Sequence, residues 1–309
     1  MKDCFGREID YLRVSLTDLC NYRCRYCMKE SGVDKKSHAD MLTLEEMYDF
    51  IKAFVSLGGK KVRFTGGEPL VRKNVISLIE RVGELPLEKI GLTTNGVFLP
   101  EYAPRLAKAN VTSVNVSIDT LDEDKYRFVT MGGDIKDALA GLRSAIDNIE
   151  EVKLNAVLMR GINDDSVKEF ASFAADLGVK LRFIELMPLA ENNSFEKYGI
   201  SATDVIAKYD LTLKETVGNT DYYAFEDGVE VGFIRPLSHK FCAHCNRLRL
   251  TSDGKLLPCL HGNEEIDAKP YIRSGKPEEA ILLAASQKPL CHELDKGKTQ
   301  TRNMNSIGG

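Results

Sequence analysis

The sequence lacks several features that would place a chain of 309 residues in a specialised class. No apolar run approaches the roughly 20 residues that span a bilayer, and the first residues lack the apolar core of a signal peptide. The formal net charge is only −4, which indicates no general attraction to nucleic acid or to anionic membranes. We therefore expect a cytoplasmic protein with no nucleic-acid or membrane partner. Tryptophan is also absent, and nothing follows from that.

Nucleotide-binding fingerprints and internal repeats are missing as well. The chain has no Walker loop and no dinucleotide fingerprint, which argues against a simple nucleotide-binding module. No fixed-period repeat is visible, which argues against a solenoid. The length allows one barrel or two ordinary domains.

Cysteine, in contrast, is present eight times, and in a reducing compartment this indicates metal binding rather than disulfides. The cysteines form two groups of three and two single residues, which we expect to be spare thiols: Cys20, Cys24 and Cys27; Cys242, Cys245 and Cys259; and Cys4 and Cys291.

The first group has the spacing Cys20-x3-Cys24-x2-Cys27, so one loop can wrap all three thiols around a single inorganic centre. Three thiolates leave one coordination position open to an outside molecule. A structural zinc site or unligated thiols are the alternatives. Because zinc motifs favour C-x2-C pairs, the three-residue gap favours an iron–sulfur site.

Six segments have the pattern of strands, and each is followed by a cysteine loop, a glycine-rich turn or a helical pattern. The expected strands cover residues 11–16, 61–65, 90–94, 113–118, 153–158 and 180–186. The expected helices cover 44–57, with a capping box at Thr43 and Glu46, then 73–83, 101–109, 122–130, 135–149 and 167–177. Repeated strand-then-helix units predict a parallel sheet covered by helices, either a barrel or an open sheet.

Several unusual motifs come directly after these strands. They are Gly66-Gly67-Glu68-Pro69, Thr93-Thr94-Asn95-Gly96 and Ser117-Ile118-Asp119. Both kinds of parallel sheet bind ligands at the carboxyl ends of their strands, so one site is expected there. Two glycines let a backbone approach a ligand closely, and Glu68 could accept an ammonium group. Ordinary turns are the alternative for each motif.

The pattern changes after about residue 195. A helix is expected at 200–208 and a hairpin at 222–225 and 229–234, around Asp227-Gly228. Residues 295–309 are polar and small, which is typical of a frayed terminus.

The second cysteine group lies in a basic stretch. Residues 235–261 contain five Lys or Arg and one acidic residue, a net of +4. On a strand, Arg247 and Arg249 would share one face, where two guanidinium groups suit an anionic ligand. The alternatives are a solvated basic surface and a closed zinc site that includes His244 or His261.

Taken together, these motifs resemble a known family. The Cys20–Cys27 loop with Tyr26, combined with Gly66-Gly67-Glu68-Pro69, resembles radical S-adenosylmethionine enzymes. Residues 12–20, the second cysteine group with Arg247-x-Arg249, and the ending 304–309 narrow the resemblance to the GTP 3′,8-cyclase family of molybdenum cofactor biosynthesis. The similarity runs from about Arg7 to the last residue. One departure is Lys29, where many relatives have proline.

The resemblance implies an α/β fold, an incomplete (β/α)6 TIM-type barrel over residues 1–195, followed by a C-terminal region, 196–309, that binds a second cluster and the substrate. It implies two 4Fe-4S clusters, S-adenosylmethionine as cofactor and GTP as substrate. The expected products are 3′,8-cyclo-7,8-dihydro-GTP, methionine and 5′-deoxyadenosine. The electron donor is not identified, and a homodimer is one option for the assembly. A radical maturase with an auxiliary cluster and a zinc-stabilised binding protein are the competing functions.

The family's functional residues are carried over position by position. The metal ligands would be the two cysteine groups, and the tail Gly308-Gly309 would reach into the active site. The cofactor contacts would be Tyr26, Gly66, Gly67, Glu68, Ser117 and Met187. The GTP contacts would be Arg13, Arg63, Thr93, Lys153, Arg247 and Arg249, and the residues nearest the chemistry would be Arg182, Arg247 and Arg249.

Overall fold

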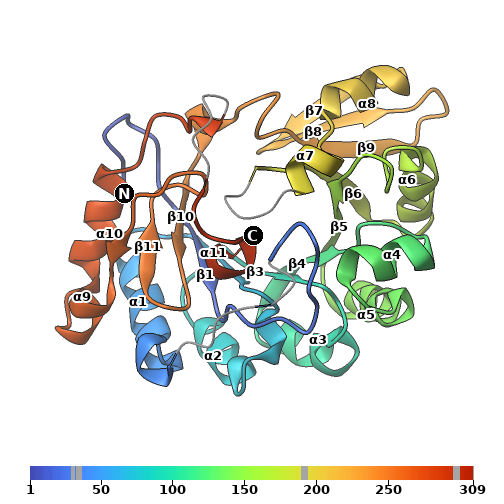
Figure 1. Cartoon of the computed structure of the whole chain (residues 1–309). Helices are drawn as coiled ribbons and strands as arrows, with labels where there is room; N and C mark the ends of the chain where they lie inside the picture. Colours follow the sequence, from blue (N-terminus) through green and yellow to red (C-terminus); the bar gives the residue numbers. More distant parts are fainter. Residues whose placement is uncertain (29–31, 33–36, 189–193, 295–299, 309) are drawn as a thin grey trace.

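The computed structural model describes residues 1–28, 32, 37–188, 194–294 and 300–308, and its strands form one curved sheet. In Figure 1, helices lie on the outer side of this sheet and the C-terminal segment lies on its inner side. The strand order is β12-β11-β10-β1-β2-β3-β4-β5-β6-β9-β8-β7.

The six expected strand-then-helix units are confirmed, with bounds shifted by a few residues. The strands are β1 (Tyr11–Ser15), β2 (Lys61–Thr65), β3 (Lys89–Thr94), β4 (Val111–Ser117), β5 (Glu151–Leu158) and β6 (Lys180–Glu185). The helices are α1 (Leu44–Ser56), α2 (Val75–Val82), α3 (Leu99–Lys108), α4 (Glu123–Thr130), α5 (Ile135–Asn148) and α6 (Val167–Asp176). Each strand from β1 to β6 pairs in parallel with the next, as predicted.

Local chemistry explains how these units form and which side of the sheet faces the helices. The predicted capping box is present, because Thr43 Oγ1 accepts from Glu46 N at 3.1 Å and Glu46 Oε2 accepts from Thr43 N at 2.8 Å. In β1, Leu12 and Val14 are fully buried in the main core, whereas the alternate residues face the inside of the curved sheet. The core therefore lies between sheet and helices, and the inner face is left for polar residues.

The C-terminal region extends the same sheet at both edges. It contributes α7 (Ser194–Tyr198), α8 (Ala202–Lys208), β7 (Thr212–Val217), β8 (Thr220–Ala224), β9 (Glu230–Ile234), β10 (Arg247–Leu250), β11 (Lys255–Leu257), β12 (Ile266–Asp267), α9 (Lys269–Arg273), α10 (Pro277–Ser286) and α11 (Met304–Ile307). Strand β9 joins β6 and β10 joins β1, both in parallel. The expected hairpin is confirmed as β8 and β9. The division of the chain near residue 195 stays a prediction.

Two further expectations concern the chain end and membranes. The alternative of a frayed terminus does not hold for residues 300–308, where Gln300, Asn305 and Ile307 are at most 2% exposed. Residues 295–299 and Gly309 lie outside the described part of the chain. Across the described residues, none of the helices is both long and apolar enough to cross a lipid bilayer.

Candidate active site

A cavity of about 620 Å³ lies inside the curved sheet, and it collects most of the residues singled out in the sequence. A volume of this size suits a small-molecule ligand. The predicted residues that line it are Arg13, Cys20, Cys24, Tyr26, Cys27, Arg63, Gly66, Gly67, Thr93, Ser117, Lys153, Arg182, Met187, Arg247 and Arg249. Glu68 and the second cysteine group are not among the lining residues, and Lys29 lies outside the described residues.

Strand register places the polar side chains in rows across the inner face. Arg13 of β1 is the register partner of Arg63 on β2 and of Arg249 on β10. A second row runs from Thr93 through Asn115 to Lys153. A third runs from Ser117 through Asn155 to Arg182. Because side chains alternate along a strand, residues in one row point into the same cavity.

The first row concentrates positive charge where little water can screen it. Burial, with the nearby guanidinium groups of Arg63, Arg247 and Arg182 acting in the same direction, lowers the pKa of Arg13 to about 10. Burial works to raise the pKa of Tyr11, but the surrounding arginines outweigh it and lower this pKa to about 8. Several cations held together in this way favour an anionic ligand that neutralises them.

Some of these cations are already engaged with protein atoms. Arg63 is 7% exposed and donates to Tyr11 Oη at 2.8 Å, to the Leu92 carbonyl at 2.7 Å and to Ser113 Oγ at 2.9 Å. Lys153 pairs with the carboxylate of Glu151. Arg63 is therefore placed to act on a ligand through its charge rather than as a mobile donor.

The sequence did not single out several residues that line this cavity. Tyr11 and Lys61 stand at inward positions of β1 and β2, and Asn155 holds Arg182 by accepting from Nε at 3.0 Å and Nη2 at 2.7 Å. The Oδ1 atom of Asn115 and the Oγ1 atom of Thr93 are buried without a hydrogen-bond partner in the described structure. For the residues that the sequence did not single out, Tyr11, Lys61, Asn115 and Asn155, strict alternation along each strand was the available signal. Orphaned polar atoms in a cavity indicate a ligand that satisfies them.

The first cysteine loop is anchored on the end of α4. The backbone N–H groups of Arg23 and Arg25 donate to the carbonyls of Thr130 and Val129, at 3.2 and 2.9 Å. Burial raises the pKa of Cys20 to about 11 and that of Cys27 to about 12, and it also raises the pKa of Cys24 well above its usual range. Cys20 also raises the pKa of both Cys24 and Cys27, and all three thiols line the same cavity. Thiols in this setting ionise only when a cation joins them, so the donor set fits an iron–sulfur cluster.

The Gly66-Gly67 turn packs directly against the segment that leads into this loop. Gly67 N donates to the Thr17 carbonyl at 2.7 Å, and Glu68 N donates to the Leu19 carbonyl at 2.9 Å. A Cβ atom on Gly66, whose φ is +151°, would lie 2.4 Å from the Thr17 oxygen. A Cβ atom on Gly67 would lie 2.2 Å from the Leu19 oxygen. Only glycine allows the two backbones to approach so closely.

Gly67→Ala is therefore expected to displace residues 17–20 and to lower iron binding at the first cysteine group. We expect a loss of stability of about 2–4 kcal/mol, because backbone atoms must move. Thermal unfolding and iron analysis measure the two effects. The control is Gly275→Ala, which adds the same methyl group in open space at a φ of +74° and should cost about 1 kcal/mol. Equal effects of the two variants would argue against this role of the turn.

Glu68 does not have the position that the sequence suggested. Its side chain is fully buried behind the cavity wall, and burial raises its pKa to about 7. Its carboxylate accepts from Leu70 N at 3.1 Å, Thr94 Oγ1 at 2.9 Å and Asn95 N at 2.8 Å. It therefore joins the ends of β2 and β3, and no geometry in the structure supports a direct contact between this carboxylate and a ligand.

Tyr26 is held in the cavity wall by Asp119. Its hydroxyl donates to Asp119 Oδ2 at 2.9 Å, and Asp119 Oδ1 accepts from Val157 N at 2.8 Å. Burial raises the pKa of Asp119 to about 6, although both hydrogen bonds oppose the rise. The motif Ser117-Ile118-Asp119 thus positions one of the predicted cofactor contacts.

The second cysteine group lies beside the cavity rather than in its wall. Its immediate neighbours line the cavity: Phe241, His244, Asn246, Leu260 and His261. Cys245 N donates to the Cys242 carbonyl at 3.1 Å. Cys259 acts to raise the pKa of Cys242, and Cys245 acts to raise the pKa of Cys259.

The electrostatic setting of this second group differs from that of the first. Burial works to raise the pKa of Cys245, but Arg247 and Lys288 outweigh it and lower this pKa to about 7. Burial raises the pKa of Cys242 to about 11.

Within the described residues, no three His, Cys, Asp or Glu side chains are gathered as ligands of a single metal ion. A cubane cluster differs from a zinc site in this respect, because each thiolate binds a different iron atom.

The contrast within the second group gives a direct test of its electrostatics. In reduced protein freed of metal, iodoacetamide should modify Cys245 at least about tenfold faster than Cys242 at pH 7–8, because the thiolate is the reactive form. Time-resolved peptide mass spectrometry measures both rates in one sample. Exposed Cys4 serves as the internal reference for an accessible thiol. Equal rates at Cys242 and Cys245 would contradict the assigned charge environment.

Comparison with known proteins agrees with this geometry. The Radical SAM superfamily model matches residues 14–174, and the Molybdenum Cofactor Synthesis C model matches residues 179–294. The chain is 44% identical to a GTP 3′,8-cyclase of Alkaliphilus oremlandii and 42% identical to one of Moorella thermoacetica. Both alignments cover 100% of this chain and 100% of the relative. This chain belongs to the GTP 3′,8-cyclase family.

Solved structures support the fold alone. The chain is similar to Streptococcus suis SuiB bound to precursor peptide SuiA, with a TM-score of 0.67 at 15% identity, over 92% of this chain and 66% of that chain. It is also similar to native anSMEcpe with bound AdoMet, with a TM-score of 0.63 at 16% identity, over 94% of this chain and 82% of that chain. The predicted α/β fold with a partial barrel is thereby confirmed.

Proposed function

We propose that this chain converts GTP and S-adenosylmethionine to 3′,8-cyclo-7,8-dihydro-GTP, methionine and 5′-deoxyadenosine, as a radical lyase in the first step of molybdenum cofactor biosynthesis. Membership of the cyclase family over the full length supports this reaction. The main structural support for this reaction is that Cys20, Cys24 and Cys27 line the same cavity as the arginines of β1, β2 and β10. The cavity thereby combines a cluster site with an anion site.

Two 4Fe-4S clusters would be held by the two cysteine groups, and S-adenosylmethionine would bind beside the first. When bound, these groups supply the one-electron chemistry that removes a hydrogen atom from the ribose of GTP. The protein's own contribution is to position and shield the reactants. The turn at Gly66-Gly67 fixes the first cysteine loop, and the Tyr26–Asp119 pair borders the space next to it.

The arginines of β1 and β10 would receive the triphosphate and the purine. Arg13, Arg247 and Arg249 belong to adjacent strands, so their guanidinium groups meet at one wall of the cavity. Guanidinium groups bind phosphate oxygens in a bidentate manner, and the buried setting strengthens these bonds. The predicted roles of Thr93, Lys153, Ser117, Arg182 and Met187 are consistent with their positions in the cavity wall.

The experiment is an anaerobic assay of reconstituted protein with GTP, S-adenosylmethionine and dithionite, followed by mass spectrometry. We expect about eight irons per chain and formation of the cyclised nucleotide together with 5′-deoxyadenosine. ATP in place of GTP is the matched control and should give no cyclised product. Cleavage of S-adenosylmethionine without a GTP-derived product would point to another substrate. Colourless protein that contains zinc would indicate a binding protein instead.

Three finer points complete the proposal. We place the protein in the cytoplasm, where reducing conditions keep thiols available for cluster binding. A separate reductant acts as electron donor, and its identity stays open. The homodimer stays a prediction, which size-exclusion chromatography with light scattering tests.

A further inference from the structure

We propose that Arg302 is a positioning residue that fixes residues 300–308, here called the strap, between the two cysteine loops. The expected effect of Arg302 on product formation rests on the proposed function. Its expected effect on the conformation of the strap does not. The proposal depends on three sets of contacts, at the start, the middle and the end of the strap.

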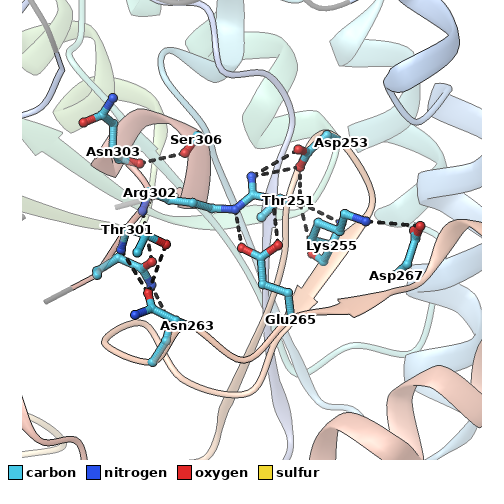
Figure 2. Close-up of polar contacts among 12 residues, drawn as sticks. Thr251, Asp253, Lys255, Asn263, Glu265, Asp267, Thr301, Arg302, Asn303 and Ser306 are labelled. Atoms are coloured by element: carbon cyan, nitrogen blue, oxygen red, sulfur yellow. Dashed lines mark hydrogen bonds and ion pairs between the residues drawn. The ribbon is translucent and has the colours of Figure 1, made fainter. Parts of the chain in front are cut away.

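At the start of the strap, the guanidinium group of Arg302 lies between two carboxylates (Figure 2). Its Nη1 donates to Asp253 Oδ2 at 3.1 Å and Oδ1 at 3.3 Å, and its Nη2 donates to Glu265 Oε2 at 2.8 Å, with Nε bound to Oε1. The three side chains are between 13% and 24% exposed. A forked geometry that is largely shielded from water makes this a stronger and more directional contact than a surface ion pair.

The same end of the strap is tied to the second cysteine loop. Gln300 is 1% exposed, and its Nε2 donates to the carbonyls of Leu260 and Gly262 at 2.9 and 2.6 Å. Leu260 follows Cys259 directly. Thr301 N donates to Asn263 Oδ1 at 2.9 Å, as Figure 2 shows.

In the middle, the strap reaches the first cysteine loop. Asn305 is 2% exposed, and its Nδ2 donates to the Asp18 carbonyl at 2.9 Å, two residues before Cys20. The backbone of Asn305 also lies near the Cys27 thiol, where it acts to lower the pKa of that thiol against the effect of burial. The neighbouring Met304 lines the cavity. The strap thus contacts both cysteine loops at once.

At its far end, the strap returns to β10. Arg249 Nη1 donates to the Gly308 carbonyl, and a Cβ atom on Gly308 would lie 2.2 Å from Thr65 Oγ1, so the fit is tight. Asp253 belongs to the turn after β10, and Arg249 belongs to β10 itself. The strap is therefore attached to Arg249 near the C-terminal end of β10 and to Asp253 in the turn that follows this strand. The contacts of Arg302 with Asp253 and Glu265, here called the clamp, lie two residues before α11. They therefore help to fix the start of this helix and the positions of Asn305 and Gly308.

The test compares Arg302→Met, which keeps the aliphatic stem, with the parent protein carrying both clusters. Hydrogen exchange followed by mass spectrometry should show about tenfold faster exchange in peptides from residues 300–308. In the anaerobic assay, the ratio of 5′-deoxyadenosine to cyclised product should rise several-fold, because cleavage continues while the substrate is less well placed. Arg302→Lys keeps the charge but not the fork, and should give intermediate values.

Arg273→Met is the matched control, because it removes an exposed ion pair with Glu46 at 2.8 Å between α9 and α1. It should leave both readouts unchanged. Glu265→Gln removes the negative charge of one partner of the clamp and should shift both readouts in the same direction as Arg302→Met. If hydrogen exchange in residues 300–308 is unchanged in Arg302→Met, the clamp does not hold the strap. If exchange is faster but the ratio of 5′-deoxyadenosine to cyclised product is unchanged, Arg302 has no positioning role in the reaction. If the parent protein makes no cyclised product, the proposed function is wrong. The hydrogen-exchange comparison still shows whether Arg302 holds the strap in place.

Discussion

The Cys24→Ser variant is expected to lose cleavage of S-adenosylmethionine by about a thousandfold or more. Cys24 is the central thiol of the first group and lines the cavity together with Cys20 and Cys27. A serine hydroxyl is a poor ligand for iron, so the first cluster would be lost or would lack one of its three protein ligands. Quantification of 5′-deoxyadenosine under anaerobic conditions measures the loss.

Cys245→Ser is expected to have a different effect, because Cys245 lies beside the cavity and not in the wall near the first group. This variant should keep part of the cleavage activity, uncoupled from product, and should make no cyclised nucleotide. Cys4→Ser is the control, since the Cys4 thiol is exposed and 3.1 Å from the Ser286 carbonyl. Equal loss of cleavage in the Cys24 and Cys245 variants would contradict separate roles for the two groups.

Arg247→Ala is expected to lower cyclisation by about 10²- to 10³-fold while the protein stays folded. Arg247 lines the cavity, lies within 5.1 Å of the Phe241 ring and contributes to the low pKa of Cys245. Its removal takes a positive charge away from the wall that would hold GTP. The assay is product formation by mass spectrometry, alongside thermal unfolding and iron content.

A matched charge change elsewhere separates this local effect from net charge. Arg127→Ala removes a cation that is 62% exposed and 3.8 Å from Asp124. This variant should retain the parent rate of cyclisation. An Arg247→Ala protein that still makes product at the parent rate would remove Arg247 from the active site.

Local patterns in the sequence predicted the six parallel strands well, because alternation and helix caps depend on neighbouring residues. The capping box at Thr43 and the hairpin at Asp227-Gly228 are examples. The pairing of β10 with β1 could not be predicted in this way, because it joins residues more than 230 positions apart. Strand β7 was missed since all six of its residues are exposed, which leaves no apolar alternation to detect.

In the candidate site, too, features set by neighbouring residues could be predicted, whereas contacts between residues far apart in the sequence could not. Residue types and spacing identified the thiols and the arginines that line the cavity. They did not reveal that Glu68 is used to join two strand ends, because its partners Thr94 and Asn95 come from the next strand unit. The polar composition of residues 300–308 concealed their burial, which arises from contacts with Asp253, Glu265 and Asp18.

The order of the strands has a consequence for how much the molecule can enclose. Strands β10 and β9 flank the β1–β6 series on opposite sides, and within the described sheet they pair with different partners rather than with each other. A fully sealed cylinder of eight strands has just enough interior for its own side chains. Leaving one seam unjoined widens the ring, which agrees with the cavity of about 620 Å³ that lies inside the sheet, where the interior of a closed barrel would be filled by its own side chains.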